Sequence, residues 1–337
     1  MRFDLSEDQQ DIKRTAHDLL ATRSGFDRVR AAAEAAAYDG GLWRELCELG
    51  WPGIAIAEEH GGQGLGVVEL CVLLEQLGAA CAATPLLGSA LAGLALAHAG
   101  SDAQRERWLP GLASGAARGA LGVVRDGSAD LVPDADGADV VVLVDPVAGS
   151  AELVGGDAVA AVTAIDPTRR HGRVSAGAGE PLDGDAAGAL DRALVAVSAE
   201  LTGVSQRALD MTVAYVKERR QFGVPVGSFQ AVQHRAAQML LDTEGARVAT
   251  YFAAWTAAAE PERAPMAAAM AKAWASEAAR GTVAAAIQLH GGVGFTWEAD
   301  VHWLFKRAQV DSRFLGGAAQ HRATVAALLR EDAGVVA

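Results

Sequence analysis

Residues 218–230, ERRQFGVPVGSFQ, place a guanidinium group, an aromatic ring and an amide around one predicted helix–helix corner. A long Ala-rich segment ends in the cations of Arg219 and Arg220, and glycine and proline follow, as is typical of a helix C-terminus. Ser228 is predicted to be the N-cap of the next helix, whose first turn holds Gln230. Such a corner can bind a ligand, and the same pattern also fits a plain helical hairpin.

A second stretch, residues 288–298 (QLHGGVGFTWE), closes another Ala-rich helical run with three glycines in four residues. Gly291, Gly292 and Gly294 carry no side chain, so the backbone there can approach another group closely and adopt positive φ. Gln288 adds an amide just before these glycines. Taken alone, this stretch also fits a helix C-cap and a turn. A functional interpretation therefore depends on the occurrence of both stretches in one sequence.

Together the two stretches resemble the acyl-CoA dehydrogenase family, whose members carry an R-x-x-F-G…FQ corner followed by Q-x-x-G-G-x-G. In that family the corner and the glycine turn of one subunit touch the ADP part of an FAD that its neighbour mainly holds. An arginine suits this duty because its planar charge pairs with phosphate oxygens. The resemblance therefore implies six FAD-binding residues: Arg219, Phe222, Gln230, Gln288, Gly291 and Gly292.

The family's catalytic base is missing from the positions that match. Family members remove the α-proton of an acyl-CoA thioester with a glutamate while a hydride passes to the flavin. Matching the glutamate loop onto residues 314–318, FLGGA, puts Gly316 at the glutamate, and the alternative position in the first bundle helix holds Ala193. Since a positioned general base is worth about 10²–10⁴ in rate, this loss argues against a self-sufficient dehydrogenase.

One substitute base lies on the same predicted helix as Ala193. Glu200 follows Ala193 by seven residues, which places it on nearly the same face and about 10 Å farther along the axis. A carboxylate there can reach a bulky substrate, or it can pair with a cation on a neighbouring helix, which is the more common arrangement. Asp191 and Asp311 are weaker candidates for the same role.

The predicted fold is mainly α-helical and follows the family's order of parts. We expect an N-terminal helical domain (1–115), a reduced middle β-domain (116–184) and a C-terminal four-helix bundle (185–337). The family uses this bundle for oligomerisation, and its long antiparallel helices and short loops position the FAD contacts. The helices expected in this part are 186–218, 229–258, 263–289, 299–313 and 318–331.

The N-terminal part begins with a capping-box pattern at Ser6 and Gln9, followed by apolar residues on one helical face. Further helices are predicted over 41–49, closed by Gly50, and over 67–77. The segment 77–100 has no formally charged side chain apart from a titratable histidine. It is rich in alanine and glycine, however, and Pro85 interrupts it, so two buried helices are expected there rather than a membrane span.

The middle part differs from the family pattern. Residues 116–182 are rich in Gly, Ala, Asp and Val, and β-like runs at 139–145 and 158–166 favour a small antiparallel barrel or sandwich. The T-E-P-x-x-G-S-D-like motif and the W-I-T-N-like strand, with which the family walls in the flavin ring, have no match here. Residues 165–169, IDPTR, resemble the family's closing strand, so the domain is expected to be trimmed rather than replaced.

Composition limits the remaining classes of function. The 337 residues carry a net charge of −13 with mixed signs along the helices, which argues against a nucleic-acid footprint. The three cysteines form no CxxC pair and indicate buried thiols rather than disulfides or a metal site. The first ten residues turn acidic at once and have no apolar h-region, so no signal peptide and a cytoplasmic location are expected.

Two classes of function follow, and the sequence leaves both open. In the first, the chain is a subunit of an FAD-dependent acyl-CoA dehydrogenase, with electron-transfer flavoprotein or a similar protein as electron acceptor. A longer homologous partner then holds the flavin ring and the catalytic glutamate, as in the mixed assemblies that shorten sterol side chains. In the second, the chain is a non-catalytic FAD- or CoA-binding homo-oligomer. A weaker third possibility is a self-sufficient enzyme that uses Glu200.

Overall fold

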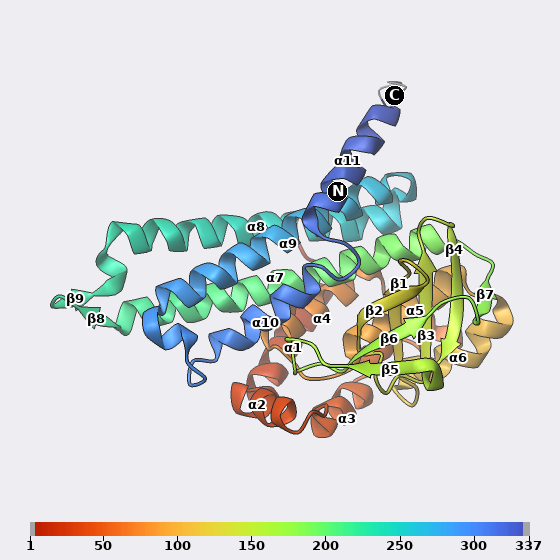
Figure 1. Cartoon of the computed structure of the whole chain (residues 1–337), viewed down its shortest axis with the longest axis horizontal. Coiled ribbons are helices and arrows are strands. Elements are labelled where there is room, and N and C mark those ends of the chain that lie inside the picture. The colour runs from red at the N-terminus through yellow and green to blue at the C-terminus, as the bar shows by residue number, and fades with distance from the viewer. Residues whose placement is uncertain (1–3, 333–337) are drawn as a thin grey trace.

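The computed structural model describes residues 4–332 and shows a helical N-terminal part, a small β part and a long helical bundle (Figure 1). The first part holds six α-helices and two short 3₁₀ turns. They are α1 (Glu7–Arg23), α2 (Phe26–Glu34), α3 (Gly40–Glu48), η1 (Trp51–Gly53), η2 (Glu58–His60), α4 (Val67–Ala79), α5 (Leu86–Ala99) and α6 (Asp102–Ser114).

Local signals in the sequence set the N-terminal helix ends as predicted. The Ser6 hydroxyl accepts from the Gln9 amide at 3.2 Å while the Gln9 side chain accepts from the Ser6 amide at 2.9 Å, which completes the capping box. Gly50 follows α3 with φ of 71°, the left-handed conformation expected of a closing glycine. Residues 1–3 of the predicted acidic N-terminus lie outside the described residues.

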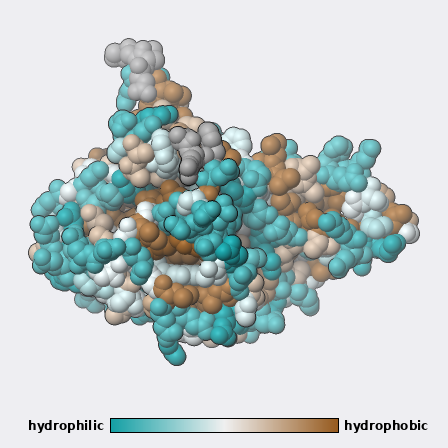
Figure 2. Space-filling view, turned by 180° about the vertical axis from the view of Figure 1, so that it is seen from behind, coloured by the Kyte–Doolittle hydropathy of each residue, from teal (hydrophilic) through white to brown (hydrophobic). Residues whose placement is uncertain are grey.

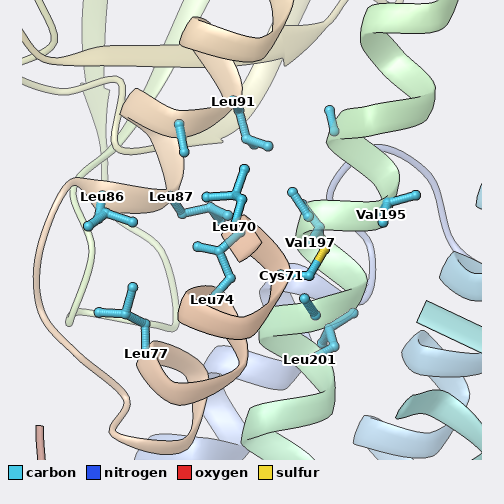
Figure 3. Close-up of a cluster of buried hydrophobic side chains, with 14 of the residues drawn as sticks. Leu70, Cys71, Leu74, Leu77, Leu86, Leu87, Leu91, Val195, Val197 and Leu201 are labelled. Carbon is cyan, nitrogen blue, oxygen red and sulfur yellow. The ribbon is translucent and has the colours of Figure 1, made fainter. Parts of the chain in front are cut away.

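The apolar segment 77–100 is two helices, as expected. α4 ends at Ala79 and α5 begins at Leu86, directly after Pro85. Within the described part of the chain, no helix is long and apolar enough to cross a membrane. Leucines of α4 and α5 instead pack against α7 (Ala186–Glu218) in the main core (Figure 3).

The middle part is a two-sheet sandwich. Its strands are β1 (Gly119–Val123), β2 (Ser128–Pro133), β3 (Val140–Asp145), β4 (Ser150–Gly155), β5 (Val159–Val162), β6 (His171–Ser175) and β7 (Glu180–Leu182), with η3 (Gly156–Ala158) before β5. One sheet has the order β1-β3-β4-β7 and the other β2-β6-β5. In β3, Val141 and Leu143 face the space between the sheets, whereas Val140, Val142 and Val144 join the main core, to which α5 contributes. Burial on both faces explains the continuous apolar run.

Two expectations for this part are corrected. β1 pairs with β3 in parallel, so the sheet is mixed rather than antiparallel. Residues 165–169 form no strand. The side chain of Asp166 accepts from the Thr168 amide at 3.0 Å, which bends the chain at Pro167, and the strand begins only at His171.

The C-terminal part matches the predicted helix bounds to within two residues. It comprises α7, β8 (Arg220–Gln221), β9 (Val224–Pro225), η4 (Val226–Ser228), α8 (Gln230–Ala259), η5 (Pro261–Arg263), α9 (Ala264–Leu289), η6 (Gly291–Phe295), α10 (Val301–Asp311) and α11 (Ala318–Asp332). Helices α7, α8 and α9 pack side by side, and α11 projects from the body (Figure 1). The predicted N-cap of α8 was wrong: Phe229 holds that position, and the Ser228 hydroxyl donates to the Pro225 carbonyl at 2.7 Å.

Two glycines let α4 and α7 approach each other closely. A Cβ atom at Gly203 would overlap the carbonyl oxygen of Glu75, and one at Gly78 would overlap that of Glu200. Both obstacles are backbone atoms of the facing helix, which no side-chain rotation can clear. The contact between the N-terminal part and the bundle therefore depends on these two positions.

We expect the substitution Gly203→Ala to destabilise the chain by about 1–3 kcal/mol, because overpacking outweighs the better helix propensity of alanine. Gly281→Ala is the matched control, since that α9 position has open space around the added Cβ. This control should be neutral or up to about 1 kcal/mol stabilising. Urea denaturation measures both, and equal stabilisation of the two variants would contradict the close helix contact.

Candidate functional site

The corner between α7 and α8 is a tight β-hairpin. β8 and β9 pair around Phe222 and Gly223, whose φ values are 54° and 84°. Positive φ at both central residues identifies a type I′ turn, which glycine adopts freely and phenylalanine adopts only at a cost. The ring of Phe222 is 92% exposed and meets Phe229 edge to face, with centroids 6.2 Å apart. The hairpin therefore holds a strained aromatic residue out into solvent.

The glycine turn lies at the same end of the bundle as the hairpin. Tyr215, in the last turn of α7, stacks on His290, the C-cap of α9, with ring centroids 4.4 Å apart. His290 Nδ1 also lies 2.7 Å from the Ala286 carbonyl oxygen, which fixes the ring. Gly291 follows with φ of 64° and opens η6. The structure thus brings together two motifs that are about sixty residues apart.

All six residues predicted to bind FAD are exposed at this bundle end: Arg219, Phe222, Gln230, Gln288, Gly291 and Gly292. A Cβ atom added at Gly291 or Gly292 would meet nothing within 4 Å, so the backbone there is open to an approaching group. An exposed guanidinium, an aromatic face, two amides and open backbone suit the ADP half of a dinucleotide. All six side chains or backbone positions are open to solvent in this chain.

Further exposed aromatic residues border the glycine turn, and the sequence did not single them out. Phe295 is 82% exposed and Trp297 64% exposed. Lys306 lies over Trp297 and Trp303, with its Nζ 4.1 and 4.7 Å from their ring centroids. Exposed aromatic residues therefore lie beside the glycine turn as well as on the hairpin. Figure 2 shows apolar and polar patches intermixed on the surface of the projecting end of the molecule.

Glu200 lies in a buried ion cluster rather than on a cleft. It is 1% exposed, and its Oε1 accepts from the Arg307 Nη1 at 2.8 Å and from the Arg169 guanidinium. Arg307 also donates to Asp166 Oδ2 at 2.6 Å, and Arg169 donates to Asp311 Oδ1 at 3.2 Å. This is the ion-paired alternative, with Arg307 supplied by the neighbouring helix α10. A carboxylate so enclosed is not placed to take a proton from a substrate.

The other acidic candidates are also partnered or remote. Burial, together with the nearby charges of Glu200 and Asp166, raises the pKa of Asp311 to about 7 although Arg169 opposes this. Burial likewise raises the pKa of Asp191 to about 6. Asp191 lies near the start of α7, whereas Asp311 belongs to the same cluster as Glu200. Ala193 is fully buried in the core.

Gly316, the position that matches the family's glutamate, lines a cleft of about 870 Å³ between the β part and the end of α10. Its φ is +104°, and a Cβ atom there would lie 2.8 Å from His321 Nε2 and 3.0 Å from Gln320 Oε1. The position is therefore shaped for glycine. The cleft has apolar walls with charged groups on both sides, Arg125 and Asp126 from the β part and Arg313 after α10. Its lining also includes Val123, Ile165, Phe305, Phe314 and Leu315.

The cysteines offer no alternative chemistry. Cys47, Cys71 and Cys81 are free, and burial raises the pKa of the Cys71 and Cys81 thiols, the latter to about 12. Neutral thiols at neutral pH are poor nucleophiles and poor metal ligands. Across the described residues no group of three or more metal-ligating side chains comes together.

Comparison with known proteins agrees with this architecture. The family described as acyl-CoA dehydrogenase, N-terminal domain, matches residues 6–116, and the family described as acyl-CoA dehydrogenase, C-terminal domain, matches residues 185–329. Acyl-CoA dehydrogenase IpdE2 of Mycobacterium tuberculosis is 41% identical over 92% of this chain and 93% of its own length. IpdE2 of Mycolicibacterium smegmatis is 37% identical over 93% of this chain and 96% of its own.

Solved structures give the same result. A variant of the Tcur3481-Tcur3483 steroid ACAD is similar with a TM-score of 0.88 and 31% identity over 97% of this chain and 99% of that chain. The ChsE4-ChsE5 complex of Mycobacterium tuberculosis is similar with a TM-score of 0.89 and 27% identity over 98% and 99%. These findings confirm the predicted fold and support FAD as the cofactor of the group. The chain belongs to the acyl-CoA dehydrogenase family.

Proposed function

We propose that this chain is a subunit of a flavin-dependent acyl-CoA dehydrogenase that lends ADP-end FAD contacts to a longer, homologous catalytic partner. The observation that carries the proposal is an asymmetry. Residues matching those that a family member offers to its neighbour's cofactor are present and exposed, for example Arg219 and Phe222. The position for its own proton abstraction holds Gly316, whose positive φ would strain any other residue.

The proposed duty of each residue follows from its chemistry. Bound FAD supplies hydride acceptance from the β-carbon of an acyl-CoA. Arg219 would pair with the pyrophosphate and Phe222 would pack against the dinucleotide. Gln230 and Gln288 would satisfy polar groups that the interface buries, while Gly291 lets the backbone come near the diphosphate. In this proposal residues 1–115, 116–184 and 185–337 act as separate domains, and the last one carries these contacts.

The exposed surface farther along the bundle supports a partner rather than a lone chain. Leu240, Leu241 and Val248 on α8 are 49%, 62% and 64% exposed, and Trp274 on α9 is 51% exposed. Large apolar side chains on two adjacent bundle helices suit contact with another bundle. Two similar structures carry paired names, Tcur3481-Tcur3483 and ChsE4-ChsE5, and the latter is called a complex. A heteromer is thus favoured over a homo-oligomer.

The substrate class remains the acyl-CoA thioester, and a bulky, sterol-derived acyl group is proposed because one similar structure is described as a steroid ACAD. Electron-transfer flavoprotein or a similar protein would reoxidise the flavin, and the assembly would work in the cytoplasm.

The alternative is a non-catalytic FAD- or CoA-binding homo-oligomer. It predicts that the chain pairs with itself and that a homologous partner adds no turnover.

We expect Arg219→Ala to weaken FAD retention by the assembled complex about 10–150-fold, because a charge-assisted hydrogen bond contributes about 1.5–3 kcal/mol. The measurement is flavin absorbance that stays with the complex after gel filtration, followed by titration of free FAD. Arg14→Ala on α1 makes the same charge change on an exposed residue outside the corner and should retain FAD normally. Undiminished retention in the Arg219 variant would count against the assignment.

A further inference from the structure

A single lysine is buried in the middle of the bundle. The chain has only four lysines, and Lys272 lies on Ala-rich α9 with 0% exposure. Its Nζ donates to the Ser276 hydroxyl at 2.9 Å and to three backbone carbonyl oxygens, those of Asp311 at 3.2 Å, Ser312 at 3.3 Å and Gly316 at 3.0 Å. A fully buried lysine is rare unless its charge is satisfied, so these contacts demand an explanation.

The three carbonyl groups belong to the last residue of α10 and to the turn that follows it. The same turn presents Phe314, Leu315 and Gly316 to the cleft of about 870 Å³. A second contact holds it from α11, where His321 Nε2 lies 3.0 Å from the Leu315 carbonyl oxygen. Lys272 and His321 thus fix the backbone of one cleft wall from behind.

The charge of Lys272 has no carboxylate partner in direct contact among the described residues. Asp311 on α10 and His321 on α11 are the titratable groups that face it. Burial lowers the pKa of the Lys272 ammonium group to about 7, although Asp311 opposes this shift. Burial and the nearby Lys272 charge also lower the pKa of His321.

We propose that Lys272 is a positioning residue whose ammonium group holds residues 311–316 in the conformation that forms the cleft wall. An ammonium group has three N–H donors, and the four surrounding oxygens use all of them. A neutral amine has only two donors, so one carbonyl group of the turn loses its partner when the proton leaves. The inference concerns the backbone of this cleft wall and goes beyond the proposed function.

The direction of the pH effect differs between the turn and the whole chain. Lys272 loses its proton in the folded state as pH rises through about 7, so the turn should loosen over that range. The unfolded chain keeps this proton up to the ordinary lysine pKa of about 10.4. Because the unfolded state binds more protons between these values, the contribution of Lys272 to global stability rises with pH there. As pH rises, the turn should loosen while the stability of the whole chain increases. This opposite behaviour distinguishes a positioning role of Lys272 from a purely structural one.

Hydrogen exchange of the turn tests this proposal without FAD or a partner. The amides of Phe314 and Gly316 donate to Val310 and Arg313 carbonyl groups at 3.0 Å and are the reporters. Exchange rates are first corrected for the intrinsic exchange rate of each amide at each pH. In the Lys272→Met variant these two amide hydrogens should then exchange about 10–100-fold faster than in the parent chain at low pH. The parent chain should approach the rate of the variant as pH rises through about 7, and the variant should show no such dependence.

Lys217→Met, which changes an exposed lysine at the end of α7, is the control and should leave these amides unaffected. Equal protection of the turn in the Lys272 variant and the parent chain would overturn the proposal, and so would protection in the parent chain that does not change with pH. If the Lys272→Met variant fails to fold, the pH dependence of hydrogen exchange in the unmodified chain still tests the proposal. The exchange experiment uses neither FAD nor a partner subunit. Its result would therefore stay the same if the proposed function were wrong, so the two proposals can be tested separately.

Discussion

Replacing Arg307 by leucine is expected to destabilise the chain by about 3–5 kcal/mol, enough to unfold a marginal domain. Arg307 is fully buried and donates to Asp166, Glu200, the Thr168 hydroxyl at 2.5 Å and, more weakly, the Ala82 carbonyl at 3.4 Å. These partners come from the β part, from α7 and from the loop after α4. Removal of the guanidinium group would leave Asp166 buried without its main cation.

The electrostatics of the cluster explain why this loss is large. Burial alone would raise the pKa of Asp166, yet Arg307, a hydrogen bond from Thr168 and Arg169 hold it below its usual value. A depressed carboxyl pKa contributes stability that is present above the unfolded pKa and is lost as pH falls through the folded one. The variant should therefore lose stability at neutral pH and approach the parent chain in acid. Chemical denaturation at both pH values measures this convergence.

Arg322→Leu provides the matched comparison. Arg322 pairs with Glu277 at 2.5 Å, but both side chains are more than half exposed. An exposed pair is screened by water and salt, so its loss should change stability by about 0–1 kcal/mol. A small effect at Arg307 similar to that at Arg322 would show that the cluster does not join the three parts of the fold.

Sequence patterns predicted the helices well because their signals are local. The capping box at Ser6, the break at Pro85 and the ends of α7 depend on residues within a few positions of each element. The sandwich was predicted only in outline. β1 pairs with β3 in parallel, and no local sequence pattern encodes the order of strands in a sheet. Residues 165–169 were expected to form a strand only because they resemble the family's closing strand.

The candidate site was also predictable only where its signals are local in the sequence. The motif residues were found because their types and spacing are unusual. The cluster around Arg307 was missed because it joins residues more than a hundred positions apart, although a lone acid on an Ala-rich helix did suggest an ion pair for Glu200. Lys272 had a usable signal: it is one of four lysines and the only charged side chain between Ala264 and Ala275, the first three turns of α9.

The last prediction is that the chain alone will not dehydrogenate acyl-CoA and will retain FAD poorly, whereas the assembly with a longer homologous subunit will do both. The six proposed FAD contacts are all exposed, so one chain alone would cover less of a dinucleotide than the enclosed pocket that tight binding needs. Purified chain, with added FAD, an electron acceptor and a panel of acyl-CoA thioesters that includes ring-bearing ones, should give no turnover above background. Addition of the product of an adjacent homologous gene should restore both activity and bound flavin.

Restoring the family's carboxylate should not rescue the lone chain. The missing base is worth about 10²–10⁴ in rate, yet Gly316→Glu meets a φ of +104° and places its Cβ 2.8 Å from His321 Nε2. The variant should distort the turn rather than gain activity. Robust turnover with stoichiometric FAD by the unmodified lone chain would overturn the prediction. Glu200→Gln would then decide whether that carboxylate leaves its arginines to act as the base, because turnover should vanish in this variant only if it does.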